Sequence, residues 1–165
     1  MKKFIILAVS LILCFSLSSC DSIIEPIDYV QNGIQITLDT SYKRSNVQKY
    51  TACYRSSVAT VYLLREAFGD ALTDTVSLAE YAAMVQNANG LTEEISEHQN
   101  YLSFEYETVA DEIRLMSLVA VYKMSDCFWT VQFVCESSYY ETLCDSFESF
   151  ASSVKDVKVT TDQQG

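Results

Sequence analysis

Three segments of this 165-residue chain alternate apolar and polar side chains, and this alternation limits the fold more than any other feature. Successive side chains of a β-strand point to opposite faces of the sheet, so a period of two indicates strands with one buried face. The three segments are 34–38 (IQITL), 101–108 (YLSFEYET) and 127–136 (CFWTVQFVCE). The chain is therefore predicted to fold around a β-sheet.

Further strands are indicated by β-branched and aromatic residues rather than by alternation. Segments 50–54 and 58–66 are rich in these residues. The apolar spacing of the second also suits a helix, but we predict a strand there. Segment 114–123 is apolar on both faces from its middle onward, which is typical of a central strand covered on both sides. Val157 and Val159 predict a last short strand.

Two helices are predicted from capping signals and apolar stripes. Ser77 and Glu80 have the spacing of a capping box, and Gly90 is a suitable stop for the helix that follows. Ser137 and Ser138 are expected to cap a second helix. Its apolar stripe comprises Tyr140, Leu143, Phe147, Phe150 and Val154. Because short turns join most strands, we predict an α+β fold with a mainly antiparallel sheet of about six strands and two main helices.

The first nineteen residues have the order of a secretory signal peptide. Two lysines precede an apolar run from Phe4 to Phe15, and small residues follow it. This run is short for a bilayer span, which takes about 20 residues, although an uncleaved anchor or a buried helix are the alternatives. Leu17-Ser18-Ser19-Cys20 resembles the lipobox of bacterial lipoproteins. The resemblance implies cleavage between Ser19 and Cys20 and a diacylglyceryl group on the Cys20 sulfur.

We expect, on this basis, an exported protein held at the outer face of the cell membrane by lipid at Cys20. The predicted parts are a signal peptide (1–19), a lipidated N-terminus and tether (20–32), one domain (33–160) and a tail (161–165). Cleavage leaves nine basic residues against 22 acidic ones, a formal charge of −13. Anionic lipid repels acidic surfaces, so the domain is expected to stand off from the membrane. No nucleic-acid partner is expected, because clustered Lys and Arg hold phosphates.

Four cysteines remain after cleavage and allow three disulfide connectivities: Cys53, Cys127, Cys135 and Cys144. Their spacing is not that of a zinc site, so no metal is expected. Cys127 and Cys135 lie too far apart on one strand to bond each other. If a disulfide forms, the pair Cys135–Cys144 is favoured, across a strand-to-helix turn. The preferred interpretation is that all four are small buried apolar residues.

The layout also resembles the PsbP-like superfamily over roughly residues 33–159. The matching segments are GIQITL at 33–38, LAEY at 78–81 and FWTVQF at 128–133, followed by a helix with Tyr139, Tyr140 and Phe147. The resemblance implies an antiparallel sheet with helices on both sides. It also implies a non-enzymatic role in assembly or binding.

The sequence contains no GxSxG, glycine-rich phosphate loop or HExxH motif, so neither an enzyme nor a cofactor is expected. The leading hypothesis is a non-enzymatic binding or accessory module of the cell envelope, with an envelope protein as its partner. Two alternatives stay open. One is an envelope hydrolase that uses carboxylates. The other is a lipoprotein that binds a small ligand or Ca²⁺ through acidic residues such as Glu93, Glu94 and Glu97.

His98 and the tyrosines are given simple structural roles. His98 lies in a polar, acidic stretch and is expected to be exposed without a role. Tyrosine is favoured at recognition surfaces but also fills protein cores. We predict core packing for Tyr29, Tyr42, Tyr50, Tyr54 and Tyr62, whereas one of Tyr139 and Tyr140 must leave the apolar stripe.

Overall fold

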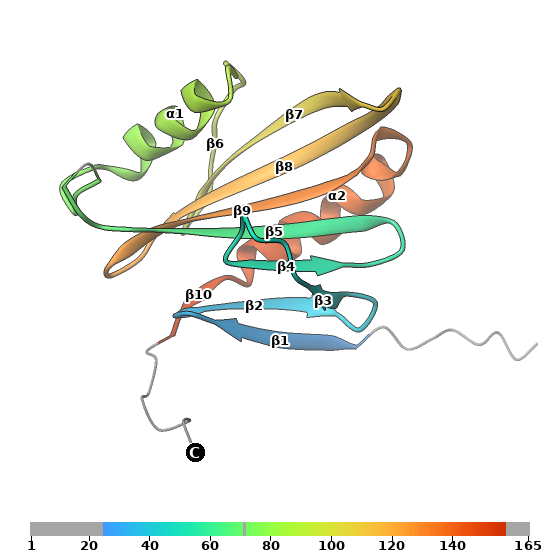
Figure 1. Ribbon diagram of the computed structural model, residues 1–165, viewed down its shortest axis with the longest axis horizontal. Helices are drawn as coiled ribbons and strands as arrows, with labels where there is room; N and C mark the ends of the chain where they lie inside the picture. Colours follow the sequence, from blue (N-terminus) through green and yellow to red (C-terminus); the bar gives the residue numbers. More distant parts are fainter. Residues whose placement is uncertain (1–24, 71, 158–165) are drawn as a thin grey trace, which may run out of the picture.

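The computed structural model describes residues 25–70 and 72–157, which form two sheets and two helices (Figure 1). The larger sheet has seven antiparallel strands in the order β3-β4-β5-β9-β8-β7-β6. They are β3 (Lys43–Ser45), β4 (Ala52–Arg55), β5 (Ala59–Ala67), β6 (Ser96–Glu97), β7 (Leu102–Ala110), β8 (Ile113–Lys123) and β9 (Cys127–Glu136).

The smaller sheet has the order β1-β2-β10 and joins the two ends of the described chain. Its strands are β1 (Pro26–Gln31), β2 (Ile34–Asp39) and β10 (Lys155–Asp156). The helices are α1 (Leu78–Ala88) and α2 (Ser137–Ser152). The predicted α+β class and the antiparallel pairing are confirmed. The strands predicted as one sheet of about six are divided between the two sheets, with β2 in the smaller one; β3 and β6, of three and two residues, are too short to show a period.

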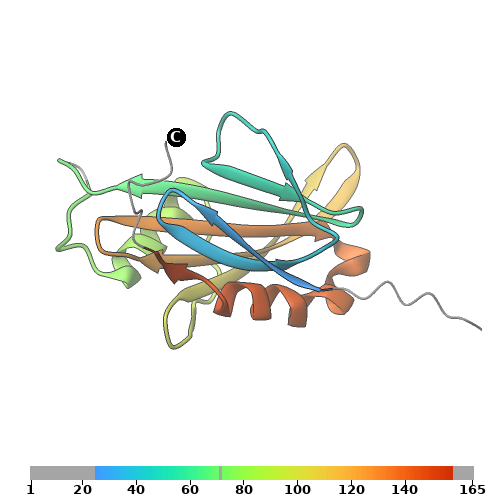
Figure 2. The ribbon, with the colours of Figure 1, turned by 90° about the horizontal axis from the view of Figure 1, so that it is seen from below.

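One face of the larger sheet is covered by α2 and the smaller sheet. Figure 2 shows β1 and β2 crossing beside α2 in front of the longer strands. A single apolar cluster fills the space between these layers. Its largest fully buried side chains include Trp129, Tyr122, Phe133, Phe147 and Leu63. The alternating pattern of 127–136 therefore predicted correctly which side chains of β9 enter the main core.

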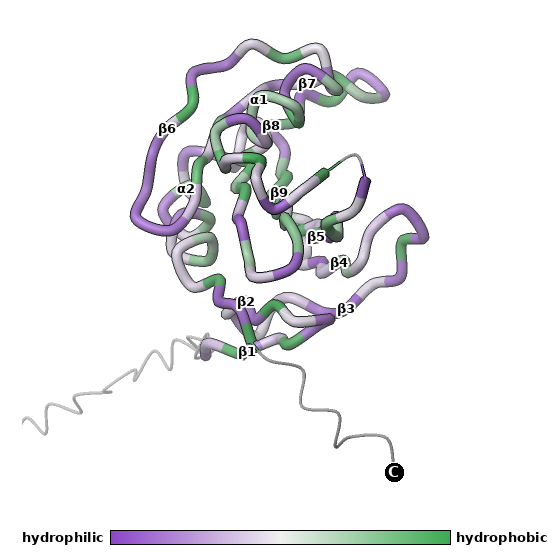
Figure 3. Tube along the Cα trace, turned by 90° about the vertical axis from the view of Figure 1, so that its left-hand side faces the viewer, coloured by the Kyte–Doolittle hydropathy of each residue, from purple (hydrophilic) through white to green (hydrophobic). Residues whose placement is uncertain are grey.

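The other face is covered by α1 over part of its area. A second, smaller cluster joins Tyr81 and Ala82 of α1 to Phe104, Val119, Val121 and Phe128 of the sheet. Figure 3, a view along the molecule, shows α1 on the opposite side of the larger sheet from β1 and β2. Helices on both sides of the sheet were expected from the PsbP-like resemblance.

The segment predicted as the second half of the tether is β1. It pairs with β2 from Pro26 opposite Asp39 to Gln31 opposite Ile34. Asn32 and Gly33 form the turn with φ of 48° and 92°. A two-residue hairpin turn of this type needs positive φ at both positions, and Asn-Gly is its preferred sequence. The domain therefore begins at about residue 26, not 33, and Asn32-Gly33 was the overlooked signal.

The two helices begin differently. Ser77 caps α1 as predicted: its Oγ accepts from the Glu80 amide at 3.2 Å, and the Glu80 carboxylate accepts from the Ser77 amide at 2.8 Å. The expected cap of α2 is wrong. Glu136 occupies its N-cap position without a side-chain hydrogen bond, and the buried Ser137 Oγ has no partner among the described residues. Strand β9 continues directly into α2, so no free residue precedes the helix to act as a cap.

The last described strand lies earlier in the chain than predicted. The last strand is Lys155–Asp156 rather than the segment around Val157 and Val159. Val159 and the predicted tail, 161–165, lie outside the described residues. The segment 59–67 is a strand, so the preferred interpretation of 58–66 is confirmed over the helical alternative.

Candidate binding cleft

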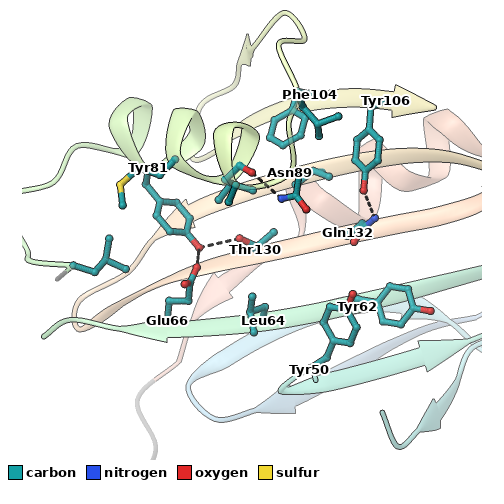
Figure 4. A pocket seen from close by; sticks show the side chains of 16 residues that line it. Tyr50, Tyr62, Leu64, Glu66, Tyr81, Asn89, Phe104, Tyr106, Thr130 and Gln132 are labelled. Atoms are coloured by element: carbon teal, nitrogen blue, oxygen red, sulfur yellow. Dashed lines mark hydrogen bonds between the residues drawn. The ribbon is translucent and has the colours of Figure 1, made fainter. Parts of the chain in front are cut away.

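A cleft of about 430 Å³ lies between α1 and the part of the larger sheet that α1 leaves uncovered (Figure 4). Strands β5, β9, β8 and β7 form its floor, and α1 forms one wall. Tyr50, from the loop between β3 and β4, borders the opposite side. The lining is mainly apolar and aromatic, with a few polar groups. Small-molecule sites in proteins usually have this composition and a volume of this order.

The strand register brings the floor residues together. Tyr62 and Leu64 of β5 lie opposite Gln132 and Thr130 of β9. These residues alternate with Leu63, Val131 and other side chains that enter the main core. The sequence placed Thr130 and Gln132 on the face opposite Trp129. It did not indicate that α1 would leave this part of the face open.

Aromatic rings from separate segments surround the floor. The rings of Tyr50 and Tyr62 stack with centroids 4.4 Å apart, and both residues are half-buried. Phe104 and Tyr106 contribute from β7. Tyr42 and Tyr54 are buried in the main core as predicted, but Tyr50 and Tyr62 line the cleft instead. Tyr139 is 45% exposed whereas Tyr140 packs on the core, so one of this pair does leave the stripe.

A hydrogen-bonded group closes one end of the cleft. The Tyr81 hydroxyl donates to the Glu66 carboxylate and lies 2.9 Å from the Thr130 hydroxyl. The Tyr81 ring stacks on Phe128 with centroids 4.2 Å apart. Burial, together with the Glu66 carboxylate, raises the pKa of Tyr81 far above its usual value. Tyr81 is protonated at neutral pH, as tyrosines ordinarily are, and its hydroxyl holds the Glu66 carboxylate at the edge of the cleft.

A second polar group lies on the floor. The Gln132 amide nitrogen donates to the Tyr106 hydroxyl at 2.7 Å and to Ser117 Oγ at 3.2 Å. Both amide hydrogens of Gln132 are thus used within the protein. The Gln132 carbonyl oxygen and the hydroxyl proton of Tyr106 are the groups left to meet a ligand.

The lining offers few groups for catalysis. Glu66 is the only acid among the described residues that border the cleft, and no His, Cys, Lys or Arg is among them. Hydrolysis by paired carboxylates needs a second acid about 5–9.5 Å from the first. The described lining therefore suits binding better than that reaction.

The acidic segment lies away from this cleft. Glu93, Glu94 and Glu105 border a separate, more polar depression beside His98. Within residues 25–70 and 72–157, no three His, Cys, Asp or Glu side chains gather as a metal ion requires. His98 is half-buried: its ring stacks on Tyr101 at 4.2 Å and its Nε2 lies 2.8 Å from Ser103 Oγ. The expectation that His98 is exposed was wrong, because His98 packs in the turn before β7.

The four cysteines are separate thiols in the structure, so the Cys135–Cys144 bond is not present in it. The Cys135 side chain enters the main core from β9, whereas Cys144 lies half-buried on α2 with Sγ 3.4 Å from the Glu141 carbonyl. Cys53, Cys127 and Cys135 are buried, and burial raises the pKa of each thiol, that of Cys127 to about 11.

The predicted cleavage site and lipid-carrying residue, Ser19 and Cys20, lie outside the described residues. Within the part of the chain that the structure describes, neither helix is long and apolar enough to cross a membrane.

Comparison with known proteins identifies the fold. No protein-family model matches the chain, and a search of curated proteins finds no match. Among solved structures, the chain is similar to cyanobacterial PsbP (CyanoP) from Synechocystis sp. PCC 6803, with a TM-score of 0.59 and 14% identity over 86% of this chain and 99% of that chain. It is also similar to the Ran-binding protein Mog1p of Saccharomyces cerevisiae (TM-score 0.53, 7% identity, 82% and 97% covered).

A third similar structure is LpqN, involved in cell envelope biogenesis of Mycobacterium tuberculosis. Its TM-score is 0.53 at 7% identity, with 81% of this chain and 90% of that chain covered. At such low identities the likeness concerns the fold alone, since one fold can serve unrelated functions. The chain has the α+β fold of PsbP, as the PsbP-like resemblance implied, and Mog1p shares this fold.

Proposed function

We propose that the chain is an exported lipoprotein, anchored to the outer face of the cell membrane through Cys20, whose domain is a non-enzymatic binding module. The order of residues 1–20 supports export and lipidation. The fold agrees in a general way with a place at the cell envelope, because one structural neighbour, LpqN, is involved in cell envelope biogenesis.

The cleft beside α1 is the observation that carries the proposal. Its volume and aromatic lining suit a small ligand with a flat, apolar body. Gln132 and Tyr106 can orient such a ligand from the floor. Glu66 favours a hydrogen-bond donor or a positive charge on the ligand at the Tyr81 end. A small ligand is preferred to Ca²⁺, which takes six to eight oxygen ligands, whereas Glu66 is the only carboxylate among the described lining residues.

Metabolic labelling tests the anchor. Cells that express the full chain are grown with labelled palmitate, and the Cys20→Ala variant is the control. We expect label in the wild-type protein and none in the variant, since only the thiol can form the thioether. A wild-type protein without label would remove the lipoprotein part of the proposal and leave the binding cleft unaffected.

A blocked cleft tests the binding site. Chains that start after Cys20 retain every described residue. They are titrated with N-phenyl-1-naphthylamine, a neutral, flat, apolar fluorophore. Ala88 is exposed on α1 and borders the cleft, whereas Ala83 is exposed on the same helix and does not. We expect Ala88→Trp to weaken probe binding at least about tenfold and Ala83→Trp to leave it unchanged.

Two results would contradict this function. Equal probe binding by the wild type and Ala88→Trp would show that the cleft is not the site. Turnover of any substrate in a panel of hydrolase substrates, lost in Glu66→Gln, would support the hydrolase alternative instead.

A further inference from the structure

The start of β1 shortens the connection between the domain and the proposed anchor. The sequence suggested a tether up to residue 32, but β1 begins at Pro26. The Thr40 amide also donates to the Glu25 carbonyl at 3.0 Å, so the chain is fixed to the domain from residue 25. Five Cα–Cα steps from Cys20 to Glu25 span at most about 18 Å when fully extended. A lipidated Cys20 therefore keeps this corner of the domain close to the membrane.

The opposite end of the domain lies much farther away. The ten residues of β9 alone extend about 33 Å along the molecule. In Figure 1 the start of β1, the turn between β2 and β3, and the turn between β4 and β5 lie at one end. The turn between β8 and β9 lies at the other end. The covalent connection thus favours one end of the domain as the membrane-proximal one.

Three basic residues gather at the tethered end. Lys43 and Arg44 of β3 and Arg55 of β4 form what we call the basic corner, and all three are exposed. Lys43 lies directly opposite Arg55 in the register. The ion pairs among the described residues, Arg65–Asp126 and Arg114–Glu107, use none of the three. Like charges in opposite strand positions destabilise a sheet, and an anionic surface would relieve this repulsion.

The acidic residues are distributed differently. Glu25 and Asp39 lie near the basic corner, and the exposed Glu136 at the end of β9 lies at the same end of the domain, three strands away from β3. The acidic turn at Asp111 and Glu112 joins β7 to β8; in Figure 1 it lies at the same end of the domain as the start of β1, but near the opposite edge of the larger sheet. Charges are screened over about 8 Å at physiological salt, so acids on distant parts of the domain act weakly on a membrane at this corner. Local charge, not the net −13, then decides how the tethered domain orients.

We infer that the basic corner rests on anionic lipid head groups. This inference depends on the lipid anchor proposed above. A basic residue near an anionic leaflet gains about 1 kcal/mol, which corresponds to about a fivefold bias per residue. The orientation turns the β8–β9 turn away from the bilayer. The expectation that the whole domain stands off from the lipid is replaced by a specific contact at one corner.

Energy transfer to the membrane tests this orientation. The full lipidated protein is reconstituted in vesicles of 70% phosphatidylcholine and 30% phosphatidylglycerol that carry an acceptor dye on some head groups. A donor dye is attached at Ser57→Cys in the β4–β5 turn or at Ser125→Cys in the β8–β9 turn, both exposed. Cys144→Ser is the background, because the other three described thiols are buried. We expect clearly stronger transfer from position 57.

Matched charge variants test the lipid contact itself. Lys43→Gln/Arg55→Gln removes two charges from the basic corner, and Lys49→Gln/Lys155→Gln removes two exposed charges elsewhere. We expect the first variant, or 0.5 M salt, to reduce the difference between positions 57 and 125 and the second variant to preserve it. Melting temperatures check that each variant is folded.

Each outcome has one meaning. Equal transfer from both positions, in protein that stays on the vesicles, overturns the orientation but leaves the anchor intact. If the difference in energy transfer between positions 57 and 125 survives both the corner variant and high salt, the tether alone orients the domain, and the lipid contact is overturned. The basic side chains on edge strand β3 then serve to prevent strand pairing. Protein that carries no lipid and leaves the vesicles refutes the anchor instead.

Discussion

The two faces of the seven-stranded sheet differ in how completely other elements cover them. The face under α2 and the smaller sheet has 21 buried residues in one cluster, whereas the face under α1 has six. The closed face includes Trp129, Phe133 and Phe147, all with no exposed surface. The open face includes the cleft and its stacked tyrosines. The difference teaches that stability comes mainly from one face of the sheet, which leaves the other free to present a binding site.

Adjacent leucines of β5 give the strongest test of this comparison. Leu63 is fully buried in the main core, and Leu64 is half-buried in the floor of the cleft. We expect Leu63→Ala to lower the free energy of unfolding by about 2–5 kcal/mol, because it leaves a cavity in a closed core. Leu64→Ala should cost less than about 1.5 kcal/mol, since part of its surface is already exposed. Urea denaturation measures both, and equal losses would show that the faces do not differ.

Stability at alkaline pH gives a second test, with a smaller expected effect, of the sheet face under α2 and the smaller sheet. Burial raises the pKa of Tyr42 to about 12, and its ring packs edge-on against Phe150 of α2. Between pH 10 and 12 the folded protein therefore binds more protons than the unfolded chain. Its stability falls as the pH rises through this window, by an amount on the order of 2 kcal/mol.

The slope of stability against pH checks the Tyr42 prediction. Tyr42→Phe should make it shallower between pH 10 and 12, with other buried tyrosines such as Tyr81 contributing the rest of the slope, whereas substitution of the 45%-exposed Tyr139 by Phe should leave it unchanged. An unaltered slope in Tyr42→Phe would mean that this hydroxyl is not buried as the structure has it.

Substitutions at the starts of the two helices should have the smallest effects on stability. The effect at α1 is expected to be destabilising, and the effect at α2 neutral or of the opposite sign. Ser77→Ala removes the capping box of α1 and should cost about 1 kcal/mol. Ser137→Ala removes a buried hydroxyl that has no partner among the described residues, so it should be neutral or slightly stabilising. Thermal melts compare the two variants. Hydrogen exchange should show faster opening of α1 in Ser77→Ala, and a greater loss in Ser137→Ala would contradict the assignment of the caps.

Local signals predicted much of the fold because they act within a few residues. Alternation located β2, β7 and β9, and the Ser77–Glu80 spacing located the start of α1. The strand β1 was missed because it lies at an edge, with four of its six residues exposed, so its apolar pattern is weak. The turn residues Asn32-Gly33 were a stronger indication of this hairpin than the strand itself.

The cleft could not be predicted from the sequence for a different reason. Its lining comes from residues as far apart in the sequence as Tyr50, in a loop, and Gln132, in β9, which only the folded sheet and its loops bring together. Tyr50 and Tyr62 look like core residues in the sequence. They remain half-buried because α1 does not cover the whole face of the sheet. The sequence around either tyrosine does not reveal how far α1 extends over that face.

The position of β2 between β1 and β10 determines the order in which the domain can be completed. β2 pairs with residues 26–31 on one side and with residues 155–156 on the other. The Thr37 amide also donates to Ser153 Oγ across 116 positions of sequence. A chain that emerges from its N-terminus can form the β1–β2 hairpin early, but it must keep one edge of β2 unpaired until residues 155–156 arrive. Contacts of such high sequence separation slow folding. The interval during which this edge is open is thus the stage at which the chain most needs protection from pairing with other molecules.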